Sequence, residues 1–202
     1  KISGTGWVGA VIQLKDSENF DLLKLVENKP SKYPFFLESS SRGNDQNRNS
    51  IVFYKPKIVL KKEKNQSIKF LNEFDKLWLK YKINQNETVF DNRKIPFCGG
   101  WFVYLGYELA NEIEAKMDIP DSPYLLPDAF IARVHSSIIF DHISRRIIIT
   151  SDKTGQMDDI NDMINDLNNL KSESSETKVN GYIEMHSKGS SDEHQNQVFA
   201  YP

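Results

Sequence analysis

The clearest pattern in the sequence is an alternation of apolar and polar positions that begins near residue 130. Apart from Ser136, every second residue from 130 to 140 is apolar, which is typical of a half-buried strand, and the members are Phe130, Ala132, Val134, Ile138 and Phe140. A polar turn over residues 141–144 follows, and the run Ile147-Ile148-Ile149 comes directly after it. The pattern therefore predicts two antiparallel strands joined by a short turn.

A second apolar run stands just before this pair. Two neighbouring glycines, Gly99 and Gly100, precede the run Trp101 to Leu105. Vicinal glycines before such a run indicate a backbone corner that feeds a buried strand, where a side chain would obstruct close approach. After Gly106, apolar residues recur four apart at Leu109, Ile113 and Met117, which predicts a helix that ends at Pro120.

Two longer stretches show the period of an amphipathic helix. The first covers residues 67–82, and its apolar side chains recur every three or four residues at Leu71, Phe74, Leu77, Trp78 and Tyr81. The second covers residues 156–170, with Ile160, Met163, Ile164 and Leu167 in line. A shorter helix is predicted around Phe20, Leu23 and Val26. An aromatic stripe at helical spacing indicates a core-facing side rather than a cofactor site.

These elements predict an α+β fold with a largely antiparallel sheet covered by helices. The strands of this sheet are expected near residues 33–38, 51–61, 98–105, 129–140 and 145–150, with a further apolar run at residues 8–14 and a bend at Pro56. Composition shifts to Ser, Glu, Lys, Asn and Gln after residue 171. We therefore expect a globular domain over residues 1–171 and a polar linker over residues 172–202, with one short strand at Tyr182-Ile183-Glu184.

Composition excludes several classes of protein. The chain has 202 residues and a formal net charge of −2, so no overall field attracts nucleic acid or an anionic membrane. A single cysteine, Cys98, excludes an intrachain disulfide framework and fits a reducing compartment. No run of about eighteen apolar residues suggests a membrane span. These features favour a cytoplasmic protein.

The residues by themselves show no catalytic constellation. The four histidines are scattered, so convergent metal ligands are not expected. His135 is interpreted as a solvated or packed strand residue rather than a base. Cys98 has no evident histidine partner and is interpreted as a structural thiol rather than a nucleophile. Gly99 and Gly100 lack the further glycines or the lysine of a phosphate-binding loop.

Four sequence blocks in order are more specific than any single residue. They read Tyr-Pro-Phe-Phe-Leu-Glu-Ser-Ser at 33–40, Pro-Phe-Cys-Gly-Gly-Trp-Phe-Val-Tyr-Leu-Gly-Tyr-Glu at 96–108, Leu-Pro-Asp-Ala at 126–129 and Ile-Phe-Asp-His at 139–142. This combination resembles the N-terminal domain of component I of the chorismate-utilising amidotransferase enzymes, which include aminodeoxychorismate synthase and anthranilate synthase. The resemblance covers roughly Leu14 to Asp152, and the first block is closer to the aminodeoxychorismate branch.

The resemblance implies a non-catalytic role for this chain. In the family, chorismate and magnesium bind in a large C-terminal domain, and none of the motifs of that domain occurs here. We therefore expect an isolated N-terminal domain or fragment that needs no cofactor itself, supports the missing catalytic domain and helps it dock a glutaminase subunit. Whether the chain is an enzyme in its own right is left open.

The resemblance also implies a ligand site at the end of the strand at 33–38. In the family, this Leu-Glu-Ser strand end helps form a tryptophan pocket, which points to Leu37, Glu38 and Ser39. A second wall is expected from the loop at residues 47–50, which contains Arg48, Asn49 and Ser50. A carboxylate can pair with an amino-acid ammonium, and a hydroxyl can bond its carboxylate. The loop lacks the aromatic residue that usually covers the indole, and a purely structural strand end is the alternative.

Three functions remain open from the sequence. The first is the non-catalytic part of an aminodeoxychorismate synthase component I, in the route to p-aminobenzoate and folate, or of an anthranilate synthase component I, in tryptophan biosynthesis. The second is a stand-alone module that binds tryptophan and regulates. The third is an unrelated interaction domain. No nucleic acid or membrane partner is expected.

Overall fold

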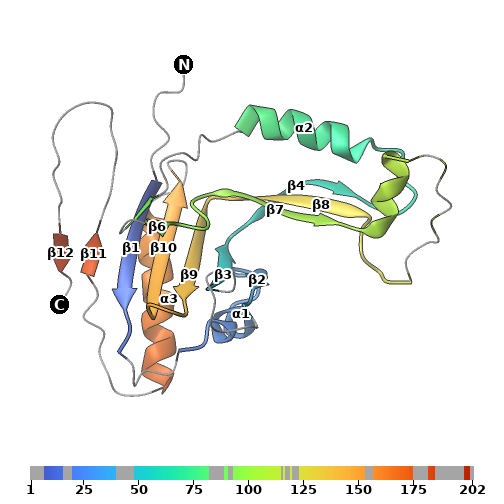
Figure 1. Ribbon diagram of the computed structural model, residues 1–202. Coiled ribbons are helices and arrows are strands. Elements are labelled where there is room, and N and C mark those ends of the chain that lie inside the picture. The colour runs from blue at the N-terminus through green and yellow to red at the C-terminus, as the bar shows by residue number, and fades with distance from the viewer. Residues whose placement is uncertain are drawn as a thin grey trace, which may run out of the picture. The chain divides into compact units, whose positions relative to one another are not determined.

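The computed structural model describes most of the chain (Figure 1). The described residues are 7–15, 20–39, 48–81, 89–90, 93–114, 116, 119, 123–152, 157–174, 182–184 and 198–200. The chain divides into two compact units. Unit 1 comprises residues 1–55, 84–99 and 134–202, and unit 2 comprises residues 56–83 and 100–133.

Unit 1 is built on a seven-stranded sheet whose described neighbours pair antiparallel. The strand order is β12-β11-β1-β10-β9-β3-β2. The bounds are β1 Trp7–Gln13, β2 Phe35–Leu37, β3 Asn49–Tyr54, β9 Ser136–Asp141, β10 Arg146–Asp152, β11 Tyr182–Glu184 and β12 Val198–Ala200. Figure 1 shows β1, β10, β9 and β3 side by side. A two-stranded hairpin, β5 (Val89–Phe90) with β6 (Arg93–Lys94), also belongs to this unit.

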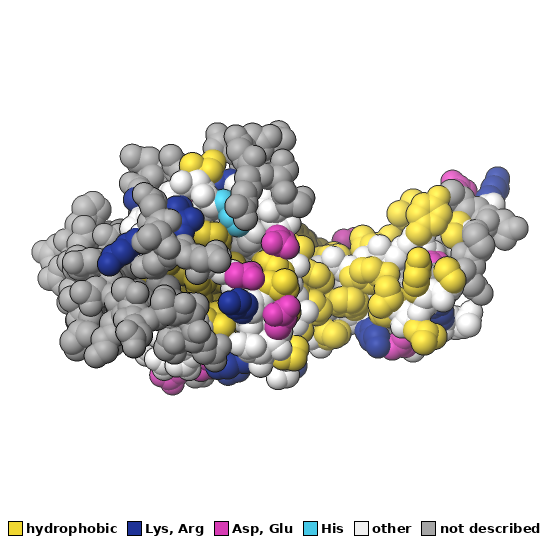
Figure 2. Space-filling view, turned by 90° about the horizontal axis from the view of Figure 1, so that it is seen from below, with side chains coloured by type: hydrophobic (Ala, Val, Ile, Leu, Met, Phe, Trp, Pro, Cys, Tyr) yellow, Lys and Arg dark blue, Asp and Glu magenta, His cyan; other side chains and the backbone are white. Residues whose placement is uncertain are grey.

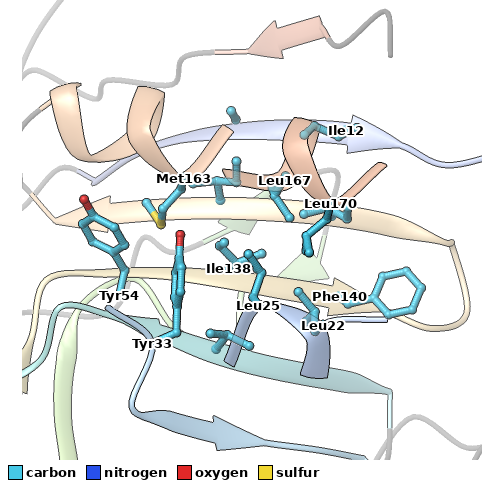
Figure 3. Packing of buried hydrophobic residues seen from close by; sticks show 14 of the residues in the cluster. Ile12, Leu22, Leu25, Tyr33, Tyr54, Ile138, Phe140, Met163, Leu167 and Leu170 are labelled. Atoms are coloured by element: carbon cyan, nitrogen blue, oxygen red, sulfur yellow. The ribbon is translucent and has the colours of Figure 1, made fainter. Parts of the chain in front are cut away.

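The central strand β9 is buried on both sides. Ile138 and Phe140 enter a large apolar cluster with α1 (Leu23–Asn28) and α3 (Met157–Ser174). Figure 3 shows Met163 and Leu167 of α3 close to Ile138. Ile139 points the other way, because successive strand residues face opposite sides, and it packs with Ile95 and Cys98. Unit 1 therefore has apolar packing on both faces of its sheet.

Unit 2 is a smaller layer of sheet and helix. Its sheet has the order β4-β8-β7, with β4 Lys57–Lys62, β7 Gly100–Leu105 and β8 Ala129–Val134. The helix α2 (Phe70–Tyr81) and the 3-10 helix η2 (Tyr107–Glu112) complete the unit. Side chains from both helices and the sheet form one buried cluster, whose fully buried members are Phe70, Leu109, Ala129 and Ile131.

The α+β class and most predicted elements are confirmed. The hairpin over 141–144 joins β9 to β10, the two long helices are α2 and α3, and the apolar run at 8–14 is β1. The chain bends at Pro56 between β3 and β4 as expected. The predicted strand at 182–184 is β11, which pairs with β1 at Val11. The rest of the predicted linker at 172–202 lies largely outside the described residues.

The single predicted sheet is wrong in one respect, because the strands form two main sheets. The expected strand over 129–140 is divided at His135: β8 pairs with β4, whereas β9 pairs with β3 and β10. The division has a physical reason. An unbroken alternation of apolar residues fixes which side chains share a face, but it does not specify which strand supplies the hydrogen-bond partners.

The predicted helix after Gly106 is shorter than its spacing suggested. It is a 3-10 helix that ends at Glu112, and Met117 lies outside the described residues. Leu109 is buried in the cluster of unit 2, but Ile113 is exposed. Of the two described members of the four-residue spacing, Leu109 therefore has a packing surface and Ile113 does not, as a short 3-10 turn allows.

The glycine corner is confirmed at Gly99. Its φ is +102°, a conformation that glycine adopts without the penalty that a Cβ brings. A Cβ at this position would lie 2.7 Å from the side chain of Asp152. The boundary between the two units falls between Gly99 and Gly100, so this corner is where the chain leaves unit 1 for β7 of unit 2.

Candidate functional site

The predicted ligand site lies where two neighbouring strands of unit 1 meet. Leu37 is the last residue of β2, and Glu38 and Ser39 follow it. Arg48 precedes β3, whose first residues are Asn49 and Ser50. Antiparallel pairing of β2 with β3 sets Leu37 opposite Ile51 and so brings the two predicted segments to the same end of the sheet.

Ser39 and Ser50 are in direct contact. The backbone N–H of Ser39 donates to Oγ of Ser50 over 3.0 Å. The same Oγ lies 2.7 Å from Nε2 of His142, in the turn between β9 and β10. Ser50 is only 2% exposed. Its hydroxyl therefore connects the end of β2 to the β9–β10 turn from inside the structure.

Arg48 is held by an acidic residue of the same turn. It forms an ion pair with Asp141, and its carbonyl accepts a hydrogen bond from the backbone N–H of His142 over 2.9 Å. Asp141 also accepts from Oγ of Ser144 over 2.6 Å. Burial by itself would raise the pKa of the Asp141 carboxyl, but hydrogen bonds from Arg48 and Ser144 outweigh it and hold that pKa below its ordinary value. Arg48 thus stabilises the turn.

The remaining predicted residues face outward. Leu37 is 50% exposed and Glu38 is exposed as well. Asn49 is half-buried and stands opposite Asp141 in the register of β3 with β9. Asn47 lies outside the described residues. The geometry leaves a carboxylate and an apolar side chain at the surface beside two linked serines, and their role in binding a ligand stays a prediction.

His142 is the neighbour that the sequence did not assign to this site. Its ring lies 4.6 Å from the ring of Phe140 in an edge-on arrangement, in addition to its contact with Ser50. Its occurrence in the Ile-Phe-Asp-His block was the available signal. What the sequence could not show is that β3 pairs with β9 in a register that sets Ser50 opposite Phe140, next to the turn.

The surroundings of the two other candidate residues, Cys98 and His135, indicate structural roles. Burial raises the pKa of the Cys98 thiol to about 12, so the nucleophilic thiolate is disfavoured at neutral pH and the interpretation as a structural thiol holds. His135, at the break between β8 and β9, has Nδ1 3.1 Å from a carboxylate oxygen of Asp152. Asp152 is the residue that a side chain at Gly99 would strike. His135 therefore belongs to the packing around the glycine corner.

Metal and membrane sites were sought in the same described ranges. Within them, no three His, Cys, Asp or Glu side chains gather so that they could hold a metal ion. Nor is any helix of the described part both long enough and apolar enough to cross a membrane.

Comparisons with known proteins give two relatives in sequence. The chain is 34% identical over 61 residues to the aminodeoxychorismate synthase of Saccharomyces cerevisiae, a match that covers 30% of this chain and 8% of the yeast protein. It is 28% identical over 130 residues to anthranilate synthase component 1 of Lactococcus lactis, which covers 61% of this chain and 28% of that protein. The chain thus spans less than a third of either relative. No family model matches the sequence.

A solved structure also overlaps the fold loosely. The crystal structure of anthranilate synthase component I from Streptococcus pneumoniae TIGR4 covers 81% of this chain, with 33% of its own chain matched, 18% sequence identity and a TM-score of 0.45. At that TM-score the overlap carries no argument about function. The two sequence matches support the relation of this chain to component I of the chorismate-utilising synthases without separating the two branches.

Proposed function

We propose that this chain is the non-catalytic N-terminal part of an aminodeoxychorismate synthase component I. The observation that carries the proposal is the 34% identity to the yeast aminodeoxychorismate synthase. The first sequence block, at residues 33–40, favours the same branch. The complete enzyme would convert chorismate to 4-amino-4-deoxychorismate, on the route to p-aminobenzoate and folate. The N-terminal part of an anthranilate synthase component I is the alternative, favoured by the longer match to the Lactococcus protein.

The role within such an enzyme is support rather than chemistry. In support of this role, burial disfavours the nucleophilic thiolate of Cys98, and Nδ1 of His135 is occupied by Asp152 beside the glycine corner. Chorismate and magnesium would bind in a separate chorismate-binding domain. A glutaminase subunit would supply the ammonia, docked on the assembled component.

Reconstitution tests this proposal. The chain is produced alone and together with the chorismate-binding domain of the Lactococcus relative, and each preparation receives chorismate, magnesium and ammonium. We expect no aminated product from the chain alone, and a complex on size-exclusion chromatography that forms product from the mixture. Because the product reports the chemistry of the added domain, the branch is tested by repeating the assay with the corresponding part of the yeast aminodeoxychorismate synthase, which is expected to bind this chain more tightly. Turnover by the chain alone, or failure of the two polypeptides to associate, would contradict the proposal.

A second candidate function is the binding of tryptophan at the end of β2. The contact between Ser39 and Ser50 favours it, because it unites the two segments that the resemblance assigns to one pocket. The exposed carboxylate of Glu38 is available to pair with an amino-acid ammonium.

Calorimetric titration with tryptophan tests this second candidate. We expect heat of binding from the natural chain and at least about tenfold weaker binding from Glu38→Gln, because a charge-assisted hydrogen bond contributes more than a neutral one. Glu27→Gln, an exposed carboxylate in α1 of the same unit, is the matched control. Absence of heat and of a melting shift with the natural chain would remove tryptophan binding and leave the synthase proposal standing.

A further inference from the structure

A side-chain hydroxyl holds the chain where β2 ends. The described pairing of β2 with β3 ends at Leu37 and Ile51, two residues before Ser39. Beyond that point the Ser39 N–H donates to Oγ of Ser50 over 3.0 Å. The Ser50 hydroxyl therefore continues the hydrogen bonding after the strand ladder and sets the direction in which the chain leaves β2.

The Ser50 hydroxyl has two partners inside the structure. Besides the Ser39 amide, Nε2 of His142 lies 2.7 Å from its Oγ. A hydroxyl has one proton to donate and two lone pairs that accept. All three groups are satisfied when the Ser39 N–H donates to Ser50 and the Ser50 O–H donates to Nε2 of a neutral His142. Hydrogen bonds that follow one another in this direction strengthen each other.

His142 is itself held from two sides. Its backbone N–H donates to the carbonyl of Arg48 over 2.9 Å. Its ring packs edge-on against the Phe140 ring, with the ring centroids 4.6 Å apart. Phe140 belongs to the large apolar cluster of unit 1. The core of unit 1 thus fixes the imidazole, and the imidazole in turn fixes the Ser50 hydroxyl.

Arg48 also has its partner within the protein. Its guanidinium forms an ion pair with Asp141, and 12% of the Arg48 side chain is exposed. Removing either partner of such a pair would leave a charge largely buried, so the contact is expected to persist when a ligand binds. Arg48 and Ser50 therefore make internal contacts, whereas the side chain of Glu38 is exposed.

We propose that His142, acting through Ser50, is a positioning residue for a ligand that binds at Glu38 and Ser39. The inference rests on the tryptophan binding proposed above as the second candidate function. A carboxylate binds an ammonium group over about 2.8 Å, so a shift of the Ser39 backbone carries the neighbouring Glu38 out of reach. The ligand class that fits is an amino acid held by its ammonium group.

Two substitutions of His142 separate its hydrogen bond from its packing. His142→Phe keeps a ring against Phe140 but removes the bond to Ser50, whereas His142→Gln keeps a polar group for Ser50 but removes the ring. Binding is measured by calorimetric titration with tryptophan at about pH 8, above the ordinary histidine pKa of about 6.5. We expect at least about tenfold weaker binding from His142→Phe and from Ser50→Ala, and binding within about threefold of the natural chain from His142→Gln.

The amide of Ser39 provides a measurement that needs no ligand. In the free chain, NMR hydrogen exchange at this amide is expected to be at least about tenfold faster in His142→Phe and in Ser50→Ala, and unchanged in His142→Gln. Amides of β10 are followed in the same spectra and should not change, which separates a local loss from general unfolding. Should His142→Phe melt at a lower temperature than the natural chain, Ser50→Ala and the exchange at Ser39 decide.

Gln13→Ala is the matched control for the turn. Nε2 of Gln13, in β1, donates to the carbonyl of Ser144 over 3.0 Å, so this variant removes a hydrogen bond to the β9–β10 turn from the side away from β3. It is expected to bind tryptophan as the natural chain does and to leave the exchange at Ser39 unchanged.

Three outcomes would overturn the inference, and they can be told apart from failure of the synthase proposal, which the titration does not involve. If the natural chain binds no tryptophan, the tryptophan-binding function fails and the role of His142 in it fails too. If the natural chain binds tryptophan and His142→Phe binds it as tightly as Gln13→Ala does, the binding function stands without this positioning residue. If His142→Gln loses binding and His142→Phe keeps it, the ring packing matters and the hydrogen bond does not.

Discussion

The two units of this protein treat their apolar side chains differently. Unit 1 exposes few of the large apolar residues that its described part contains, and most of the fully buried side chains among the described residues lie there. Its exposed large hydrophobic residues are Leu23, Leu37, Ile143 and Met157. Unit 2 is smaller, yet it exposes Ile58, Val59, Trp78, Leu79, Tyr81, Val103, Leu105, Tyr107, Ile113, Tyr124, Leu125 and Leu126. The two units therefore differ in how complete they are.

The difference shows that unit 2 lacks the covering elements that bury the apolar residues of unit 1. A small body has a high ratio of surface to volume and cannot enclose its own apolar residues unless more material covers it. Unit 1 gains that cover from α1 and α3 on one face and from the segment around Ile95 and Cys98 on the other. Unit 2 has α2 against one face of its sheet, and the half-buried rings of Phe102, Tyr104 and Phe130 lie on the other. The sheet of unit 1 is therefore covered on both faces by residues of the same unit, whereas unit 2 leaves many of its large apolar side chains exposed, and Figure 2 shows hydrophobic side chains gathered over one side of it.

The largest expected effect comes from matched truncations in the two units. Met163→Ala removes a fully buried side chain in the core of unit 1 and should lower the free energy of unfolding by about 3 kcal/mol, because it leaves a cavity. Ile58→Ala in unit 2 should cost less than about 0.5 kcal/mol, since a half-exposed side chain loses few contacts. Urea unfolding measures both. Equal losses would show that unit 2 is packed as tightly as unit 1.

A slightly smaller effect is expected from the ion network that anchors α3. Asp166 is 4% exposed, and it accepts from Nζ of Lys32 over 2.6 Å and from the Tyr33 hydroxyl over 2.7 Å. Asp166→Ala removes one of the two carboxylates that pair with Lys32 and leaves the buried Tyr33 hydroxyl without this acceptor, so it should cost about 2 to 3 kcal/mol, measured by thermal unfolding. Asp158→Ala, at the exposed start of the same helix, is the control and should cost well under about 1 kcal/mol. If the two variants melt together, the network does not hold α3.

Unit 2 contains a comparable but weaker anchor at Glu112. Its two carboxylate oxygens accept from the backbone N–H groups of Phe70 and Leu71 at the start of α2, and one of them also pairs with Lys62 over 2.6 Å. Glu112→Ala should cost about 1 to 2 kcal/mol, as the loss of a helix cap does. Hydrogen exchange should report the loss in α2 rather than in α3. Asp75→Ala, an exposed acid on α2, serves as control, and faster exchange in α3 would contradict local anchoring.

The smallest effect is expected from a fall in pH, which should lower the stability of unit 1 more than that of unit 2. Burial alone would raise the pKa of the Asp162 carboxyl, but hydrogen bonds from Lys32 and Tyr54 lower it to about 2. A depressed folded-state pKa contributes stability that is present above the unfolded value near 4 and is lost as the pH falls through about 2.

The carboxyls of Asp141 and Asp166 in unit 1 also have lowered pKa values, as does Glu112 in unit 2. Acid titration followed by hydrogen exchange between pH 5 and pH 2 should therefore destabilise unit 1 earlier than unit 2. Asp162→Asn should flatten the response of unit 1 only. A simultaneous loss of both units would show that these carboxyls do not distinguish them.

Much of the local structure could be read from the residues. Helical spacing located α2 and α3, apolar positions two residues apart located β8 and β9, and the paired glycines located the corner at Gly99. Such patterns depend on which side chains share a face, which the chain geometry fixes within a few residues. Cys98 was interpreted correctly for a similar reason, because its apolar neighbours in sequence indicated burial.

The candidate site shows which contacts could not be predicted from the sequence. Leu37, Glu38 and Ser39 were assigned from one block and Arg48, Asn49 and Ser50 from the loop that follows. The contact between Ser39 and Ser50 and the approach of His142 depend on the pairing of β2 with β3 and of β3 with β9. Residues 50 and 142 are far apart in the sequence, and no local pattern specifies their register.

The sequence by itself determined the class of fold, the main helices and strands, and a relation to the chorismate-utilising synthases through four short blocks in order. Only the tertiary structure decided that the strands divide into two sheets at Pro56 and His135, and that β7, an apolar run typical of a buried strand, is half-buried at Trp101, Phe102 and Tyr104 and exposed at Val103 and Leu105. The physical reason is that side-chain periodicity is a property of neighbouring residues, whereas burial depends on which other surfaces are present to exclude water.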